Sequence, residues 1–402
     1  GAVTAMVNAL RGGTRDGTND PFFDPKIAAA PIGSWTDAVG TTFFWRVPPR
    51  GTQQALSVLS AFVREPVFDP NEVQLQLQQQ LDSIRGASNN QLQQLARSGI
   101  PGLKRPSFEE DARGLFHLPT ATLQQIHRCN LQPAGAELVV AGPVAPDSVL
   151  AWATAGFGSW RADAAATAAT CADIVVAPFP EHPERARRER PLLTVIYGYR
   201  GDPWLVLDVP GPGIDSPDYL PFELLSKLLE EHQSGSARAL RHAGATYGFH
   251  VSTYDRYSRV SLLEISGQVE QVRAQAAIRG LVEDIRGIAE RLDAAQLESI
   301  KRRWRTETAD SWAHGDGLAG ALQWQLRRGR KAEELVSVLD EGQLIDVARC
   351  REVAQRYLSP AQPSIAVTAP APTGYTQSIV KGIELGAELR QVYWTDEIKE
   401  HK

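Results

Sequence analysis

Two passages of this sequence repeat one pattern: the end of a helix, a turn with proline, and a β-branched strand closed by a further proline. The first passage covers residues 128–143 and the second covers residues 356–370. Each is typical of the closing strand of a half-molecule, because proline cannot continue the hydrogen-bond ladder of a central strand. Helical patterns of similar character precede them, at 53–64 and 219–232. The chain is therefore predicted to fold as two related halves.

The length of 402 residues is sufficient for two or three domains, each with a core of its own. We predict an N-terminal half at 1–160, a linker at 161–191 that is first rich in alanine and then densely charged, and a C-terminal half at 192–372. A polar tail follows at 373–402.

Hydrophobic periodicity predicts the individual elements. The predicted strands lie at 42–47, 137–141, 192–197, 204–209 and 260–266, and the predicted helices lie at 73–85, 272–290, 295–306 and, with breaks, 333–357. Strands and helices alternate in both halves, and neither half contains a glycine-rich phosphate-binding motif.

Composition excludes several classes of protein. Hydrophobic residues make up 43% and charged residues 22%, and the net charge is −5, so neither nucleic acid nor an anionic membrane surface is an expected partner. The three cysteines, Cys129, Cys171 and Cys350, are widely separated and odd in number. We therefore expect neither a disulfide scaffold nor a clustered cysteine metal site, and the cysteines do not indicate a redox compartment. Because the sequence opens with Gly1, we expect the natural start and any signal segment to lie upstream.

Several segments together resemble a known family. Residues 1–14 read GAVTAMVNALRGGT, which is similar to the zinc helix Gly-x-x-His-x-x-Glu-His-x-x-x-x-Gly-Thr of the pitrilysin/insulinase family of zinc metallopeptidases. Residues 65–86 resemble the family's Pro-x-Phe segment and the helix of its third zinc ligand. Residues 118–142 and 210–249 resemble its later landmarks, so the resemblance covers about residues 1–370.

The resemblance implies a zinc site whose chemical positions are empty in this sequence. In the family, two histidines one turn apart grip the metal and a glutamate between them activates the bound water. The histidine positions are Thr4 and Asn8 here, the glutamate position is Val7, and the third ligand falls at Ser83. None of these side chains is an imidazole or a carboxylate, so no zinc is expected in this chain.

No substitute site is evident. No two of the eight histidines have the spacing of a helical metal grip; they are His117, His127, His182, His232, His242, His250, His314 and His401. The run Glu230, Glu231 and His232 is more typical of a polar surface or a charged helix end, because adjacent residues do not face one another on a helix. No serine or cysteine hydrolase motif is present.

The family's substrate-binding pair is kept in the second half. Residues 240–247 resemble the family pattern Leu-Arg-x-x-x-Gly-x-x-Tyr, shortened by one residue, and supply Arg241 and Tyr247. In the family the arginine holds a substrate carbonyl and the tyrosine stabilises the oxyanion beside the metal. The alternative is that Arg241 only ends a helix and Tyr247 only packs in a core.

Two functions follow from the resemblance. The first is the non-metallated subunit of a heterodimeric zinc peptidase, which adds Arg241 and Tyr247 to the site of a zinc-bearing partner and cleaves peptides in an enclosed chamber. The second is a structural or peptide-binding scaffold that has lost proteolysis, like the core proteins of respiratory complexes. The implied fold is α+β, with two homologous halves that face each other like a clamshell, each a mainly antiparallel sheet with helices on one face.

Three further expectations accompany these hypotheses. An extended peptide would add to a sheet edge near residues 36–44, within a large cavity between the halves. The opening strands of the N-terminal half are expected to lie outside the printed sequence. The bacterial periplasm is favoured over the cytoplasm.

Overall fold

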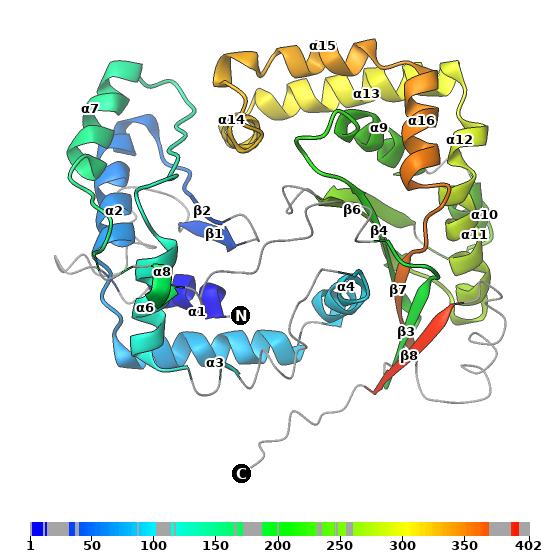
Figure 1. Cartoon of the computed structure of the whole chain (residues 1–402), viewed down its shortest axis with the longest axis horizontal. Helices are drawn as coiled ribbons and strands as arrows, with labels where there is room; N and C mark the ends of the chain where they lie inside the picture. The colour runs from blue at the N-terminus through cyan, green and yellow to red at the C-terminus, as the bar shows by residue number, and fades with distance from the viewer. Residues whose placement is uncertain are drawn as a thin grey trace. The chain divides into compact units, whose positions relative to one another are not determined.

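The computed structural model describes residues 2–10, 13, 32–36, 40–86, 88–101, 114–115, 118–164, 166, 168–171, 187–198, 201–230, 235–244, 246, 248–254, 260–369 and 387–393. The chain divides into two compact units (Figure 1). Unit 1 comprises residues 1–86, 106–177 and 311–324, and unit 2 comprises residues 87–105, 178–310 and 325–402. Each unit draws on three stretches of the chain, whereas the predicted halves are continuous in sequence.

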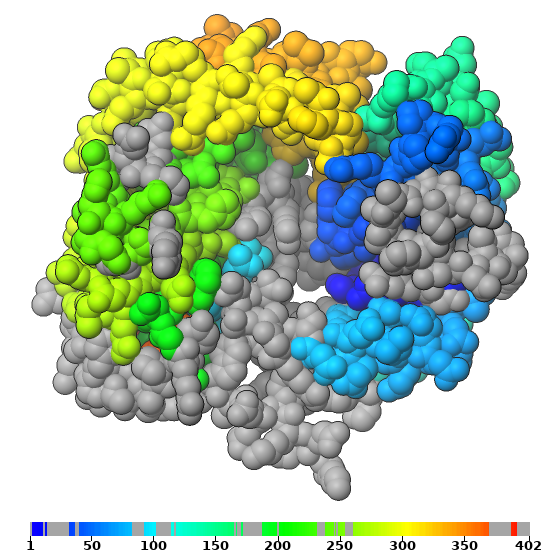
Figure 2. Space-filling view, turned by 180° about the vertical axis from the view of Figure 1, so that it is seen from behind, coloured from blue at the N-terminus to red at the C-terminus, as the bar shows by residue number. Residues whose placement is uncertain are grey.

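Unit 1 is mainly helical in its described part. Its helices are α1 (Ala2–Ala9), α2 (Thr52–Arg64), α3 (Pro70–Gly86), α6 (Thr120–Asn130), α7 (Pro146–Phe157) and α8 (Ala168–Cys171), with the 3-10 turn η2 (Pro49–Gly51) before α2. The helices predicted at 53–64 and 73–85 are confirmed as α2 and α3. Figure 2 shows α3 along the surface of unit 1, as expected for a helix that buries only one side.

Helices α2 and α7 meet at Gly156. The Gly156 carbonyl accepts hydrogen bonds from Ser60 Oγ and from Arg64 Nη1, each at 2.7 Å. A Cβ at Gly156 would lie 3.2 Å from the Ser60 Cβ, so a larger residue would push the helices apart.

The strands described in unit 1 are β1 (Gly33–Thr36) and β2 (Thr41–Phe44), which pair antiparallel. The strand predicted at 42–47 is confirmed as β2 but ends at Phe44. Helix α14 (Gly315–Arg327) begins in this unit, and its Gln323 Nε2 donates to Thr42 Oγ1 at 2.9 Å.

The strand predicted at 137–141 is wrong. These residues form an irregular segment in which Leu138 is 43% exposed, although their sequence resembles that of a strand in unit 2. Within the described residues, no strand pairs with this segment. A β-branched sequence gains little from an extended conformation when no neighbouring strand satisfies its backbone.

Two of the three cysteines form a disulfide, which their number and spacing did not predict. Cys129, in the last turn of α6, is bonded to Cys171, at the end of α8. The two cysteines are 42 residues apart, which is why their sequence spacing gives no indication of the bond. The third cysteine, Cys350, is a free and buried thiol.

Unit 2 is built on a sheet with six strands in its described part. Its strands are β3 (Leu192–Tyr197), β4 (Trp204–Pro212), β5 (Phe249–Tyr254), β6 (Val260–Gln268), β7 (Ser364–Ala369) and β8 (Glu388–Tyr393), in the order β5-β6-β4-β7-β3-β8. Neighbours from β5 to β7 are antiparallel, and β3 is parallel to both β7 and β8. The strands predicted at 192–197, 204–209 and 260–266 and the α+β class are confirmed. Strand β8 was not predicted and lies within the polar tail.

Helices surround this sheet. They are α4 (Ser88–Ser98), α9 (Tyr219–Glu230), α10 (Gly235–His242), α11 (Ala274–Arg286), α12 (Ile288–Arg291), most of α13 (Ala294–Trp312), α15 (Ser337–Leu344) and α16 (Val347–Tyr357), with the 3-10 turns η4 (Gln271–Arg273) and η5 (Ala332–Glu334). The helix predicted at 272–290 is divided at Gly287 into α11 and α12. Helix α4 lies on the opposite face of the sheet from α9 (Figure 1), which adds a covered face to the predicted arrangement.

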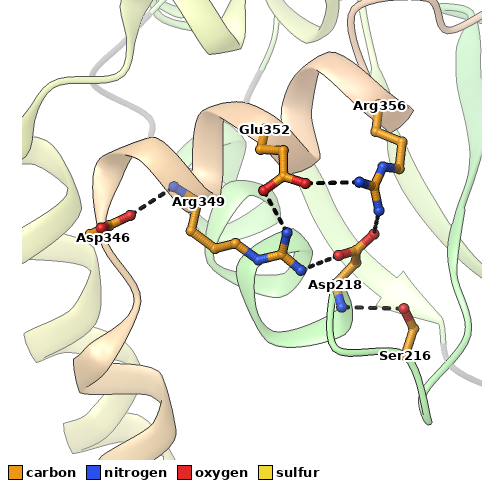
Figure 3. A network of polar contacts seen from close by, with 6 residues as sticks. All are labelled: Ser216, Asp218, Asp346, Arg349, Glu352 and Arg356. Atoms are coloured by element: carbon orange, nitrogen blue, oxygen red, sulfur yellow. Dashed lines mark hydrogen bonds and ion pairs between the residues drawn. The ribbon is translucent and has the colours of Figure 1, made fainter.

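A polar network joins α16 to the start of α9 (Figure 3). Asp218 is only 2% exposed and accepts hydrogen bonds from Arg349 and Arg356, the second at 2.6 Å. Glu352 pairs with both arginines, at 2.7 and 2.8 Å. Because each charge in the network has a partner, the buried Asp218 is a stable anchor for α16.

Within the described part of the chain, none of the helices has the length and apolar character needed to cross a membrane.

Candidate functional site

Helix α1 carries Thr4, Val7 and Asn8, the positions at which the resemblance predicts a degenerate zinc grip. Thr4 is exposed and Asn8 is half-buried, whereas Val7 is only 3% exposed. Ala5 and Met6 are buried beside Val7, so this short helix is held by its apolar contacts. The position predicted to correspond to the family's catalytic glutamate is thus occupied by a core side chain.

Helix α3 carries Ser83, the predicted third position, and contacts α1. It begins at a cap: Asp69 Oδ1 accepts from the backbone N–H groups of Asn71 and Glu72, at 2.9 and 3.0 Å. The N–H of Val67 donates to the carbonyl of Gly13 at 2.9 Å, which ties the segment after α1 to the segment before α3. The structure therefore brings together the two helices on which the degenerate zinc positions were predicted.

Of the histidines described in unit 1, His127 on α6 is more buried than His314. Its Nε2 lies 2.8 Å from the carbonyl of Val63, and its ring packs edge-on against Phe68. Burial lowers the pKa of His127, against the opposing effect of the hydrogen bond to Val63. A neutral imidazole with one nitrogen hydrogen-bonded to the backbone is a structural group. Among the described residues, no three His, Cys, Asp or Glu side chains are grouped as metal ligands.

The β1–β2 hairpin includes the edge predicted to receive a peptide. Trp35 and Phe44 are exposed by 42% and 52%, and their ring centroids are 5.4 Å apart. Thr36 and Thr41 pair through their hydroxyls at 3.2 Å. Within the described residues β1 and β2 pair only with each other, and a strand edge that is not paired can receive a further strand. An exposed aromatic pair beside such an edge can bind apolar side chains of an extended peptide.

Arg241 lies at the C-terminal end of α10 and is exposed. The helix is fixed through the buried Leu240 and contacts α11, while Arg238 Nε lies 3.3 Å from His242 Nε2. Gly244 follows with φ of 69°, a conformation that favours glycine and ends the helix. Tyr247 lies outside the described residues. Thr246 beside it donates from Oγ1 to the carbonyl of Gln268 at 2.6 Å.

Sequence reasoning missed a buried polar cluster in unit 2. Asp208 on β4 and Glu264 on β6 lie directly opposite each other and are both 0% exposed. A signal was available, since each is the lone charged residue of its strand, in WLVLDVPGP and VSLLEISGQ. Arg97, which pairs with Glu264 at 2.8 Å, comes from the distant helix α4 and could not be matched to it from the sequence.

Residues 118–303 match the family model described as the peptidase M16 inactive domain. M16 is the family of pitrilysin and insulinase, so the predicted resemblance to this family is confirmed over the matched residues. A comparison with curated proteins found no match.

Three solved structures with similar folds define the relatives further. A protease from Helicobacter pylori has 13% sequence identity and a TM-score of 0.73, over 92% of this chain and 90% of its own. The first half of the periplasmic protease PqqL from Escherichia coli has 13% identity and a TM-score of 0.66, over 96% and 89%. A chain of complex III2 from Candida albicans has 10% identity and a TM-score of 0.68, over 95% and 89%. At these identities the similarity establishes a common fold.

Proposed function

We propose that this protein is the non-metallated, substrate-binding subunit of a heterodimeric zinc peptidase. A homologous partner supplies the zinc site, and this chain supplies Arg241 and Tyr247 to it. The complex cleaves extended or unfolded peptides within an enclosed chamber. Alone, the chain is inactive, because Thr4, Asn8 and Ser83 offer no good zinc ligand and Val7 offers no base.

The observation that carries this proposal is the exposure of Arg241 at the end of a well-anchored helix, in a chain that matches the M16 inactive domain. A planar guanidinium presented on a fixed helix can bind a peptide carbonyl with defined geometry. An arginine with only a structural role would instead use its donors within its own unit, as Arg97 does with Glu264.

The hairpin in unit 1 is the proposed peptide-binding element. Main-chain pairing with β1 or β2 would accept many sequences, while Trp35 and Phe44 would contact alternate side chains of the peptide. Such recognition suits a subunit that binds unfolded peptides of varied sequence.

The bacterial periplasm is the proposed compartment. The disulfide between Cys129 and Cys171 supports it, because disulfides persist in oxidising compartments and are rare in the cytoplasm. The similar PqqL fold is described as that of a periplasmic protease, which is consistent with this location.

Reconstitution with the zinc-bearing partner tests the proposal. Arg241→Ala and Tyr247→Phe are compared with wild type for melting temperature, assembly and peptide turnover. We expect turnover to fall about 100 to 1000-fold, the effect of losing one oxyanion donor, with assembly and melting unchanged. The purified chain alone should contain no stoichiometric zinc by elemental analysis.

Arg238→Ala is the matched control, because Arg238 is also an exposed arginine on α10. It should leave turnover near the wild-type level. An equal loss in Arg238→Ala, or a loss only in variants that unfold, would assign Arg241 a structural role. One tightly bound zinc per chain, with chelator-sensitive activity, would contradict the proposal that the partner supplies the zinc site.

A scaffold without proteolysis is the second candidate. The fold shared with a chain of complex III2 favours it, because that chain is part of a multi-protein complex, whereas the other two similar structures are those of proteases. It predicts that the chain assembles with its partner and that Arg241→Ala and Tyr247→Phe leave every activity of the assembly unchanged.

A further inference from the structure

Helix α4 covers one face of the unit 2 sheet with a small apolar contact. Leu92 and Ala96 pack with Ile196 of β3, Val206 of β4 and Ala366 of β7. At the end of the helix, a Cβ on Gly99 would lie 2.0 Å from Ser364 Oγ, so the α4 backbone rests directly on β7. Two cations hold this end: Arg188 Nη1 donates to the Gly99 carbonyl at 2.6 Å, and Arg390 Nη2 donates to the Leu95 carbonyl at 3.0 Å.

A row of polar residues crosses the sheet beneath α4. Ser252 of β5 lies opposite Glu264 of β6, which lies opposite Asp208 of β4, which lies opposite Ser364 of β7. Val206, two residues before Asp208, packs against α4, so the row faces the same helix. Covered sheet faces are normally apolar, and a row of this kind raises the cost of covering this one.

The two carboxylates of this row differ in their hydrogen bonding. Glu264 accepts from Arg97 Nη2 and from Gln93 Nε2, each at 2.8 Å, and both donors belong to α4. Asp208 is 0% exposed, and neither of its carboxylate oxygens has a hydrogen-bond partner among the described residues. The cluster thus has one buried cation for two carboxyl groups.

Charge and burial decide the protonation of Asp208. Burial raises its pKa well above the ordinary value, the negative charge of Glu264 raises it further, and Arg97 opposes both effects. In the described part of unit 2, the charged groups that face Asp208 are Glu264 from β6 and Arg97 from α4, while β7 offers only the hydroxyl of Ser364. A neutral Asp208 leaves Arg97 and Glu264 as a matched pair.

We propose that Asp208 and Glu264 form a buried proton-binding site that controls how firmly α4 is seated on the sheet. With one proton bound, the cluster holds α4 through the Arg97–Glu264 pair. When the proton leaves, the cluster contains two carboxylates in a dry site, and lifting α4 exposes both to water. This proton-binding site does not depend on the proposed peptidase function.

The sign of the pH dependence follows from linkage. The raised pKa belongs to the seated state, and an Asp208 exposed by lifting α4 has an ordinary pKa. The packing of α4 on the sheet is therefore most stable below the ordinary pKa of an aspartate. It becomes less stable as the pH rises toward the raised pKa of Asp208. In that window the equilibrium constant for lifting α4 increases by up to about tenfold per pH unit and then levels off.

Hydrogen exchange of the full chain tests the proposal. The exchange of backbone amides in residues 88–101 is measured by mass spectrometry over a pH series and divided by the intrinsic exchange rate at each pH. Wild type should show α4 opening that increases with pH. Asp208→Asn keeps the shape of the side chain without its titration, so its α4 opening should not change with pH and should be rarer at neutral pH.

Asp202→Asn is the matched control, because it makes the same substitution at an exposed aspartate just before β4. It should reproduce the wild-type profile. Circular dichroism verifies that each variant is folded. The proposal is overturned if Asp208→Asn retains the wild-type pH slope, or if amides of β4 and β6 open as often as those of α4 at each pH, since the whole unit would then be opening.

Discussion

The segment at 137–141 and strand β7 have similar sequences and different structures. Strand β7 is buried at all six positions and pairs with β3 on one side and β4 on the other. The segment in unit 1 pairs with no described strand and exposes Leu138. The difference shows that a β-branched sequence favours a strand, whereas the neighbouring strands decide whether it forms.

The two units also differ in how far an ion pair is buried. Unit 2 buries an ion pair, Arg97–Glu264, in which the two side chains are 8% and 0% exposed. In unit 1, the pair Arg46–Asp316 has similar chemistry but is 77% and 62% exposed. In the buried pair, removing either residue leaves the other charge without water or a partner, which is costly. In the exposed pair, water can solvate the remaining charge, so the cost is small.

A proline placed in each of the two similar segments should give the largest difference. Ala366→Pro in β7 should destabilise unit 2 by more than about 3 kcal/mol, because it removes a ladder hydrogen bond from a central strand. Leu138→Pro should change the free energy of unfolding by no more than about 0.5 kcal/mol. Urea denaturation followed by circular dichroism measures both. A large loss in Leu138→Pro would mean that the segment at 137–141 is a paired strand after all.

Removing the cation of each ion pair should give the next largest difference. Arg97→Ala leaves Glu264 buried without its charged partner and should cost about 3–5 kcal/mol of unfolding free energy. Arg46→Ala should have no measurable effect on the unfolding midpoint. The double variant Arg97→Leu with Glu264→Leu should recover most of the loss, because the penalty comes from the unpaired charge. Similar costs for the two single arginine variants would refute the role of burial.

Loss of the disulfide should affect unit 1 alone. Cys129→Ala with Cys171→Ala opens a loop of 42 residues and should cost about 2–4 kcal/mol. Thermal unfolding of the variant, compared with wild type in the presence and absence of reductant, measures this effect.

Cys350 provides an internal control for the disulfide. It is fully buried, and burial raises the pKa of its thiol to about 12, so it should not react with a thiol reagent in the native protein. Unfolding without reductant should reveal one thiol, and unfolding with reductant should reveal three. Three reactive thiols without reductant would contradict the disulfide.

The stabilities of the two units should depend on pH in opposite directions. These effects are expected to be the smallest of the predicted changes. Burial lowers the pKa of His127 in unit 1, so its contribution to stability is present above 6.5 and is lost as the pH falls through the lowered value. Burial raises the pKa of Asp208 in unit 2, so its contribution is present below 3.8 and is lost as the pH rises through the raised value.

Stability measured from pH 5 to pH 8, with one variant for each unit, separates these contributions. His127→Gln should flatten the loss of stability toward acid pH, and Asp208→Asn should flatten the loss toward alkaline pH. If either variant keeps the full wild-type profile on its own side, the group has been assigned wrongly.

Local sequence determined much of this protein. The amphipathic patterns of α2 and α3 and the largely apolar sequences of β3, β4 and β6 define their own elements, because each is set by side chains a few residues apart. The landmarks of residues 1–14 and 240–247 indicated the family and the positions Thr4, Val7, Asn8 and Arg241 without any knowledge of distant contacts. Val7 is the residue at which the resemblance predicts the loss of a catalytic carboxylate, and that prediction rests on one position of the sequence.

Only the tertiary structure decided the features that depend on distant partners. Strand β8 has a polar sequence and forms because β3 presents an edge beside it, and the segment at 137–141 stays irregular without a described neighbour. The bond between Cys129 and Cys171 and the pairing of Arg97 with Glu264 join residues that are 42 and 167 positions apart. A sequence pattern records the chemistry of each group. Which groups meet, and whether water reaches them, is decided when the chain packs, because desolvation and pairing energies exist only in the folded arrangement.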